Sequence, residues 1–524
     1  MYKNGNLLIG KNDKKEVNLL LNMSNRHGLI TGASGTGKTI TSKVMAEGFS
    51  DAGVPVFMAD VKGDLSGTAE KGIINEKIQA RIDSLKLEEF EPKAFPVRFW
   101  DVYRVNGIPV RFKVSDVGPI LLSMMLGLSE AQEGVLNILF SIAEDEGIQL
   151  DDLKDLKYAL NYIGENRSNY TLKYGNITTQ SIGVILRSLN TLENQGLDKF
   201  FGIPSLNIFD FISINENGKG IINILDAVEL YKNPDLYSTV MLCLLTNLYD
   251  QMPEIGDVDK PKIVFFFDEA YFLFREMPSY RLKQIEKIVR LVRSKGIGLY
   301  FITHYTTDIP DMILEQLGNR VQHNLRAYTP ADQKIAKAAA DSFRANPKFN
   351  TYDTILELGI GEALVSFQNE KGEPEIVEKV TILPPQSIIG VISPESRKYI
   401  IESNKFFVEY KEDKEEESAY EKINKINEEK QAEKNRIMQE EQEKKAEIEK
   451  AKAEAAAKKE EERLAKEEAK KKAAEEREKA KKEREEEKAK KNSWQYKLGK
   501  KATNKVIDKS LNKGISAIFK GLFK

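Results

Sequence analysis

The sequence contains one cysteine, Cys243, and a single thiol excludes a fold built on disulfide bonds. Because Cys243 stands in an apolar run with helical spacing, we interpret it as a buried side chain. The chain also lacks a membrane-spanning run, since no window approaches the roughly 18 uninterrupted apolar residues that such a helix needs. Its first residues, MYKNGNLLIG, lack the basic and then apolar pattern of a secretory signal. We therefore expect a cytoplasmic protein.

An excess of charge of either sign is also missing, because 79 basic and 81 acidic residues leave a formal net charge of −2. This balance argues neither for nor against binding to nucleic acid, so any basic surface must be local. The hydrophobic fraction of 41% is slightly low for a globular protein, and the charged fraction of 31% is high. One segment near the C-terminus causes much of this bias.

Most of the chain alternates between apolar, β-branched runs and helical stretches, which is typical of a mostly parallel sheet covered by helices. The runs that predict strands are 6–10, 16–21, 28–31, 54–60, 220–225, 262–268 and 297–303. We therefore predict an α/β core made of residues 1–66 and 216–410. Residues 67–215 lie between the two parts, and apolar residues recur in them at helical spacing. We interpret 67–215 as a mostly helical lobe inserted into the core.

The composition changes abruptly near Glu412: over residues 412–491 Glu, Lys and Ala dominate, and no Gly or Pro interrupts a helix. Glu→Lys pairs four residues apart recur, and each stabilises a helix by about 0.2–0.5 kcal/mol. The few apolar residues do not sustain a heptad. We therefore predict a solvated single helix over 411–492, with a coiled coil as the alternative.

The last residues, 493–524, regain apolar side chains, and Ile507, Leu511 and Ile515 fall on one helical face flanked by lysines. This pattern predicts a basic amphipathic helix. Such a helix packs against a protein partner or lies on an anionic membrane surface.

Eight consecutive residues match the phosphate-loop pattern GxxxxGK[ST] in full: Gly32, Ala33, Ser34, Gly35, Thr36, Gly37, Lys38 and Thr39. The glycines let the loop curl so that backbone N–H groups face phosphate oxygens. Lys38 is then expected to reach the β- and γ-phosphates of ATP, and the Thr39 hydroxyl to bind Mg²⁺. A predicted strand precedes the loop and a predicted helix follows it, as this mechanism requires.

Two carboxylates, Asp268 and Glu269, follow a run of five apolar residues at the end where ligands of such sheets bind. We predict that Asp268 holds Mg²⁺ through water and that Glu269 is the general base for the attacking water. The alternative is that they cap the next helix. His304 follows another predicted strand and would face the γ-phosphate if that strand lies between the other two. Asp60 also ends a strand, where it forms either part of the site or an ordinary turn.

Several motifs together resemble the HerA–FtsK superfamily of motor ATPases, and more closely its YjgR-like branch. They are RHGLITG at 26–32, DVKGD at 60–64, FWDV at 99–102, EAQEGVL at 130–136, the Asp-Glu strand and LGNRV at 317–321. The resemblance covers about residues 5–390. It implies a RecA-like P-loop NTPase core, a homo-hexameric ring, ATP bound between subunits, and an arginine supplied in trans. Arg293 matches that arginine best, with Arg290 and Arg320 as the other candidates.

Two departures from the superfamily limit what the resemblance implies. The superfamily usually has Gln where this chain has His304, whose charge depends on pH. Only about thirty residues precede the phosphate loop, which leaves no room for the N-terminal β-barrel by which HerA docks its nuclease partner. We therefore infer no nuclease partner. We expect an ATPase that translocates on double-stranded DNA or acts like a helicase. The alternatives are an ATPase acting on protein or at a membrane surface, and a regulatory NTPase.

Overall fold

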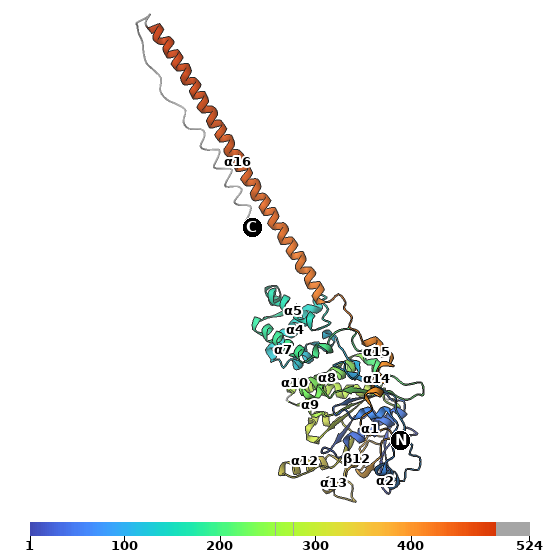
Figure 1. Cartoon of the computed structure of the whole chain (residues 1–524). Coiled ribbons are helices and arrows are strands. Elements are labelled where there is room, and N and C mark those ends of the chain that lie inside the picture. Colours follow the sequence, from blue (N-terminus) through green and yellow to red (C-terminus); the bar gives the residue numbers. More distant parts are fainter. Residues whose placement is uncertain (257, 276, 489–524) are drawn as a thin grey trace. The chain divides into compact units, whose positions relative to one another are not determined.

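A computed structural model describes residues 1–256, 258–275 and 277–488 of this α/β protein (Figure 1). The amphipathic helix predicted over 493–524 lies outside the described residues. The chain divides into two compact units, residues 1–428 and 429–524. The first unit contains the sheet and the predicted nucleotide site.

One large sheet forms the centre of the first unit, and it has 13 strands within the described residues. Its parallel part runs, in spatial order, through β11 (Asn319–Gln322), β4 (Gly28–Thr31), β10 (Ile297–Thr303), β9 (Ile263–Phe267), β5 (Val56–Asp60), β8 (Ile222–Asp226), β6 (Val97–Asp101) and β7 (Ile108–Pro109). Antiparallel strands extend it beyond β11: β12 (Glu362–Ser366), β13 (Glu378–Ile382), β2 (Asn6–Lys11), β1 (Tyr2–Lys3) and β3 (Glu16–Leu20). The prediction of a mostly parallel sheet is confirmed.

The central strands are continuous apolar runs because helices cover both of their faces. Every residue of β9 and β10 is buried. On one face, Phe49 of helix α1 (Lys38–Asp51) packs against the rings of Phe266 and Tyr300. On the other face, Phe274 of helix α9 (Tyr271–Phe274) packs against Phe301. This packing fixes the strand ends that carry the polar residues of the site.

The range predicted as a helical lobe contributes both to the sheet and to a helical layer. Strands β6 and β7 lie within 67–215. In the main sheet β6 pairs with β8, and the short β7 pairs with β6. The sequence pattern hid β6 because Arg98 interrupts its apolar run. The Arg98 guanidinium is buried and donates to the Asp210 carbonyl at 2.6 Å, which gives this charged group a hydrogen-bond acceptor inside the core.

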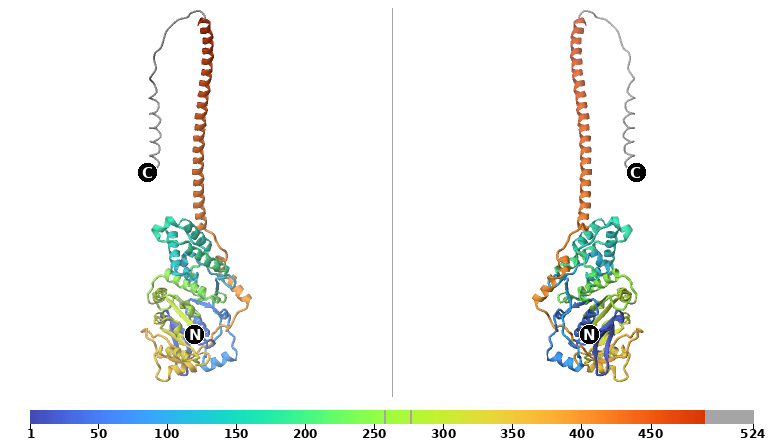
Figure 2. Two further views of the ribbon diagram at one scale, coloured as in Figure 1. Left: turned by 90° about the vertical axis from the view of Figure 1, so that its left-hand side faces the viewer. Right: turned by 90° about the vertical axis from the view of Figure 1, so that its right-hand side faces the viewer.

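The helices of this range gather together at one end of the first unit (Figure 2). They are α3 (Val114–Met125), α4 (Glu130–Asp145), α5 (Leu153–Glu165), α6 (Arg167–Tyr174) and α7 (Thr179–Asn194), while the short α2 (Glu76–Leu85) precedes β6. Arg281 joins this layer to the core from helix α10 (Ser279–Val292). It forms a buried ion pair with Glu133 and donates to the Ser123 hydroxyl at 3.0 Å. Helix α8 (Pro234–Gln251) packs against α3 beneath the layer.

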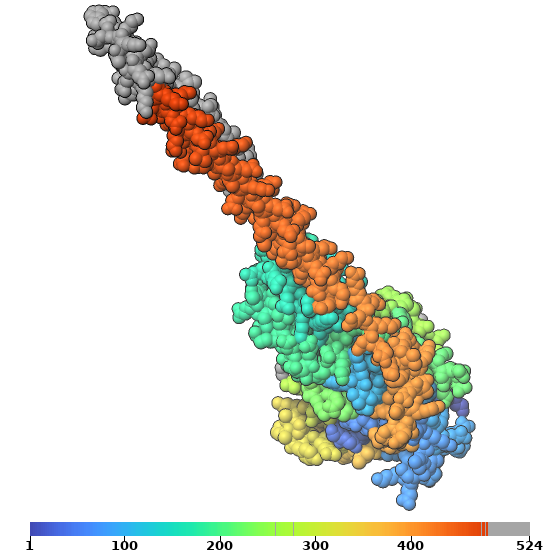
Figure 3. Space-filling model, turned by 45° about the horizontal axis from the view of Figure 1, so that its top comes forward, coloured from blue at the N-terminus to red at the C-terminus, as the bar shows by residue number. Residues whose placement is uncertain are grey.

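After β13 the chain runs along the surface of the first unit, where residues near 400 are orange in Figure 3. This segment forms two short helices, α14 (Pro394–Glu402) and α15 (Lys405–Tyr410). Three helices from earlier in the chain complete the first unit: α11 (Asp311–Leu314), α12 (Pro330–Asp341) and α13 (Thr351–Glu357). Arg397 of α14 pairs with Asp226 at 3.1 Å and its guanidinium lies over the Phe99 ring. These contacts fasten the segment to β8 and β6.

The predicted charged helix is α16 (Ala419–Lys488), which begins eight residues later than the predicted range 411–492, while residues 489–492 of that range lie outside the described residues. Its first turn is anchored in the first unit, where Ala419 donates its N–H to the Gln149 carbonyl and Ile423 is buried. From 429 on, the described side chains are exposed, including its few apolar ones, Ile437, Met438, Ile448 and Leu464. Within the described residues, no helix combines the length and the apolar content needed to cross a bilayer.

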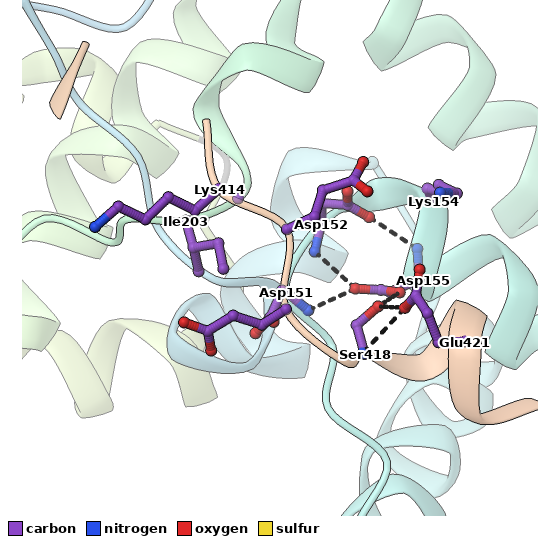
Figure 4. Close-up of a pocket in the computed structure, with 11 residues that line it drawn as sticks. Asp151, Asp152, Lys154, Asp155, Ile203, Lys414, Ser418 and Glu421 are labelled. Carbon is purple, nitrogen blue, oxygen red and sulfur yellow. Dashed lines mark hydrogen bonds between the residues drawn. The ribbon is translucent and has the colours of Figure 1, made fainter. Parts of the chain in front are cut away.

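Figure 4 shows a small acidic pocket at the first turn of α16. The Ser418 hydroxyl lies within hydrogen-bonding distance of both Asp155 and Glu421, at 2.6 Å from each, and Asp155 also forms a capping box with Asp152 at the start of α5. These carboxylates therefore serve as helix caps. Among the described residues, no group of three or more His, Cys, Asp or Glu side chains is arranged to hold a metal ion.

Candidate nucleotide-binding site

The phosphate loop joins the end of β4 to the start of α1. Gly32, Gly35 and Gly37 all have positive φ, at 151°, 77° and 123°, in the region that favours glycine. A Cβ at Gly32 would lie 2.6 Å from His323 Cβ, and one at Gly37 would lie 3.3 Å from His323 Cε1. The loop therefore curls closely over His323, and only glycine fits these positions.

The start of α1 is suited to an anion. Gly37 is its N-cap residue and provides no side-chain cap, so the N–H groups of the first turn remain available for phosphate oxygens. The Lys38 ammonium is buried within the loop, where it donates to the Gly32 carbonyl at 2.6 Å and to the Ala33 carbonyl at 3.3 Å. Burial lowers the pKa of Lys38. A buried ammonium beside free N–H groups fits a polyphosphate.

The carboxylate pair lies at the same edge of the sheet, directly after β9. Asp268 Oδ1 accepts the N–H of Glu269 at 2.9 Å, and the Tyr237 hydroxyl donates to the Asp268 carbonyl at 2.5 Å. Burial, with the neighbouring charge of Glu269, raises the pKa of Asp268 to about 6. Glu269 has a left-handed φ of 49°, which is costly for a residue with a side chain. The fold thus holds a strained backbone where the general base is predicted.

His304 lies beside Glu269. Strand β10 runs between β4 and β9, which is the arrangement that the prediction for His304 requires. The His304 Nε2 is 3.4 Å from Glu269 Oε2. Burial alone would raise the pKa of Glu269, but the hydrogen bond and charge of His304, with the charges of Lys62 and Lys38, hold it below its usual range. Glu269 is therefore ionised at neutral pH and oriented by the imidazole.

The charges of Lys38, Asp268 and Glu269 act on one another, because each carboxylate raises the pKa of Lys38 and Lys38 lowers the pKa of each carboxyl. The structure therefore brings the two predicted halves of the site together. Thr39 stands in the first turn of α1, and Asp268 directly follows β9, which is the second strand from β4 in the sheet. A hydroxyl and a carboxylate, together with phosphate oxygens, are ligands that Mg²⁺ prefers, so these residues fit the ion.

Arg293 lies at the opposite edge of the sheet. It follows α10 and precedes β10, and with Arg26 and Arg290 it lines a polar pocket at the amino ends of β4, β10 and β11. Strand β4 alone separates the two edges by roughly 13 Å. Arg293 is therefore not part of the phosphate site of its own chain. Arg320 is engaged elsewhere, since its guanidinium donates to the carbonyls of Leu314, Leu317 and Ser342.

Sequence reasoning missed the support beneath the loop. The Glu362 carbonyl accepts from His323 Nδ1 at 2.9 Å, so Nε2 accepts the Thr41 hydroxyl proton at 2.8 Å. The Asn324 carbonyl accepts the N–H of Ala33 at 2.9 Å. The available signal was the polar sequence Gln-His-Asn at the end of β11, which parallel pairing places beside the loop.

For Asp60 the structure supports the ordinary turn. Its carboxylate accepts the N–H groups of Gly63 at 2.7 Å, Asp64 at 3.1 Å and Leu65 at 3.0 Å. Burial, together with the charges of Asp64 and Asp226, raises the pKa of Asp60 to about 6. Asp60 is thus a structural residue that shapes the loop after β5.

Comparison with known families matches residues 6–517 to the family model described as helicase HerA-like C-terminal. The chain belongs to this family. The predicted resemblance to HerA is thereby confirmed, and the chain is a P-loop ATPase-type protein with an α/β core. It is similar to the DNA double-strand break repair helicase HerA of Saccharolobus solfataricus, with 24% identity over 364 residues. The match covers 68% of this chain and 64% of that relative, so it spans less than two thirds of the relative's length.

Solved structures with detectable likeness include a bacterial conjugative coupling protein and a VirB4 protein. The coupling protein TrwBΔN70, in its unbound monoclinic form, is 13% identical, with coverage of 72% of this chain and 90% of that chain and a TM-score of 0.47. VirB4 of Thermoanaerobacter pseudethanolicus is also 13% identical, with coverage of 76% and 99% and a TM-score of 0.43.

Proposed function

We propose that this HerA-family protein binds Mg²⁺–ATP at residues 32–39 and hydrolyses it. The observation that carries the proposal is the meeting of Lys38 with Asp268 and Glu269 at one edge of the sheet. The loop supplies N–H donors and a buried ammonium. The strand end supplies two carboxyl groups, of which Asp268 has a raised pKa and Glu269 a lowered pKa. Nucleotide hydrolysis needs this combination of charge neutralisation and a base.

Each residue has a distinct role in this proposal. Lys38 and the first turn of α1 hold the β- and γ-phosphates, while Thr39 and Asp268 hold Mg²⁺, which supplies charge neutralisation at the transferred phosphoryl group. Glu269 accepts a proton from the attacking water. His304, 3.4 Å from Glu269, keeps that carboxylate oriented and occupies the place of a sensor for the terminal phosphate.

We further propose that the site is completed by a second copy of the chain in a homo-hexameric ring. The support is the placement of Arg293 at the edge opposite to its own phosphate loop. An arginine there serves hydrolysis only when it reaches the nucleotide of a neighbouring subunit. The measurement is the mass of the particle in solution with and without an ATP analogue, by light scattering.

The substrate that we propose for the motor is double-stranded DNA. The support is the family and the relative in Saccharolobus solfataricus, which is named as a DNA repair helicase. The test is the ATPase rate with duplex DNA, single-stranded DNA or RNA, together with duplex affinity over a range of salt. Each phosphate contact steepens the salt dependence by about one unit of logarithmic slope. A slope near zero and no stimulation would contradict a DNA motor and favour a regulatory NTPase.

The alternative is an ATPase that acts on protein or at an anionic membrane surface. The observation that favours it is α16, whose first turn is anchored to the first unit and whose later described side chains are exposed. Flotation of the full chain and of a chain ending at 492 with anionic vesicles separates the two readings. Equal recovery of both proteins would exclude a membrane role for residues 493–524.

A further inference from the structure

Lys62 lies in the turn after β5 and has no role in the site as described above. The turn is fixed because the Asp60 carboxylate accepts three successive backbone N–H groups, those of residues 63–65. Gly63 has a φ of 76°, which lets the chain reverse immediately after Lys62. The Lys62 backbone is therefore held in one place at the carboxyl edge of the sheet, while its side chain is exposed.

That place is beside the carboxylate pair. Strand β5 neighbours β9 in parallel, with Val56 opposite Val264 and Met58 opposite Phe266. The same register continued by two residues brings Asp60 level with Asp268, so the turn starts next to the end of β9. The positive charge of Lys62 lowers the pKa of Asp268 and of Glu269, in each case more strongly than Lys38 does.

Lys62 and Lys38 also repel each other, because the charge of Lys62 lowers the pKa of Lys38. Two other lysines near the loop already have hydrogen-bond partners: the Lys38 ammonium donates to loop carbonyls, and the ammonium of buried Lys43 on α1 donates to the Ile388 carbonyl. In the part of the chain that the structure describes, no ion pair or hydrogen bond engages the Lys62 ammonium. The cations Lys38 and Lys62 and the carboxylates Asp268 and Glu269 therefore lie at the same edge of the sheet, and an anion bound between the two cations would relieve their repulsion.

We propose that Lys62 is a second phosphate-binding lysine, which contacts the terminal phosphate of a nucleoside triphosphate held by the loop. This inference rests on the proposed function, since it requires the nucleotide to bind at residues 32–39. The turn made by Asp60 positions the lysine, and its flexible side chain closes on the terminal phosphate. Lys62 therefore distinguishes a triphosphate from a diphosphate, because the diphosphate lacks the group that it contacts.

The test compares Lys62→Met and Lys62→Arg with a control, Lys14→Met, in the turn between β2 and β3. For each full-length protein, the affinities for ADP and for a non-hydrolysable ATP analogue are measured with Mg²⁺, together with kcat. Loss of a charged hydrogen bond costs about tenfold or more in affinity. Lys62→Met should therefore weaken analogue binding about tenfold, leave ADP binding within about threefold, and lower kcat. Lys62→Arg should keep most of the analogue affinity and most of kcat, and Lys14→Met should match the wild type in both quantities.

Two results would overturn the inference: Lys62→Met with wild-type analogue affinity and kcat, or equal losses for ADP and the analogue, which would show a structural role. The inference and the proposed function fail separately. If the wild type binds both nucleotides without turnover, the proposed hydrolysis is wrong, while the ratio of analogue to ADP affinity still decides the role of Lys62. If the wild type binds neither nucleotide, both proposals fail.

Discussion

The two edges of the parallel sheet carry opposite parts of the proposed chemistry. At the carboxyl edge, the charges of Lys38, Asp268 and Glu269 act on one another, and Glu269 is further oriented by His304. At the amino edge, Arg26, Arg290 and Arg293 line a polar pocket. In the proposed function, the groups of the first edge bind and hydrolyse a nucleotide, and the cations of the second stabilise the transferred phosphoryl group in a neighbouring subunit. On this proposal, one chain carries two halves of a site that only a second copy can join.

The largest expected effect tests whether the carboxyl edge binds nucleotide. Lys38→Ala removes the ammonium that lies inside the phosphate loop, and we expect loss of nucleotide binding and of turnover by at least roughly a hundredfold. The measurement is ATP turnover with direct nucleotide binding by calorimetry. Lys14→Met is the control for loss of one positive charge. Wild-type turnover in Lys38→Ala would refute the site.

Binding and hydrolysis at the carboxyl edge should separate in Glu269→Gln. This change removes the base but keeps the side-chain shape, so we expect hydrolysis to fall by about 10²–10⁴ while ATP binding persists. Retention of unhydrolysed ATP on the purified protein checks both halves of the prediction. The exposed Glu375→Gln, on the strand-connecting segment before β13, is the matched control. Hydrolysis at the wild-type rate would show that Glu269 is not the base.

The pH dependence of stability compares one histidine at each edge. Burial lowers the pKa of His27 at the amino edge and of His323 at the carboxyl edge to about 4, against 6.5 in an unfolded chain. Below pH 6.5 the unfolded chain gains protons that the folded chain does not accept, so stability falls as the pH drops from 6.5 to 4. Each histidine should account for on the order of 3 kcal/mol of this loss.

His27→Gln and His323→Gln should each flatten the dependence of the unfolding midpoint on pH over this range. Only His323→Gln should also weaken nucleotide binding, because His323 packs beneath Gly32 and Gly37. His27 instead donates from Nε2 to the Val289 carbonyl and accepts the N–H of Leu299, far from the phosphate loop. Equal effects of the two variants on nucleotide binding would remove the distinction between the edges.

Local patterns predicted the carboxyl edge well. The phosphate loop has a fixed spacing of glycines, lysine and threonine, and strands β4 and β10 have the predicted bounds because they are short, uninterrupted apolar runs. Strand β6 was missed because its buried Arg98 is satisfied by the carbonyl of Asp210, a partner distant in sequence. From sequence alone, a charged residue predicts an exposed position and not a buried strand, because its hydrogen-bond partner in the fold is not known.

The support beneath the loop and the role of the amino edge could not be predicted for a related reason. His323 reaches Thr41 only because β11 lies next to β4, and nothing in the sequence near either residue encodes that neighbour. The assignment of Arg293 came from the resemblance to motor ATPases. Its proposed function depends on the surface of a second chain, which a single chain does not contain.

The most direct test of a site shared by two chains is the ATPase rate of a mixture of two variants, each expected to be inactive alone. Arg293→Ala keeps the carboxyl edge intact, and Glu269→Gln keeps the amino edge intact. If an arginine of one subunit completes the site of the next, a mixture of the two proteins should hydrolyse ATP faster than either alone, since some interfaces then join two intact edges. Full activity of Arg293→Ala alone, or no gain in mixtures shown to co-assemble, would contradict a site shared through Arg293.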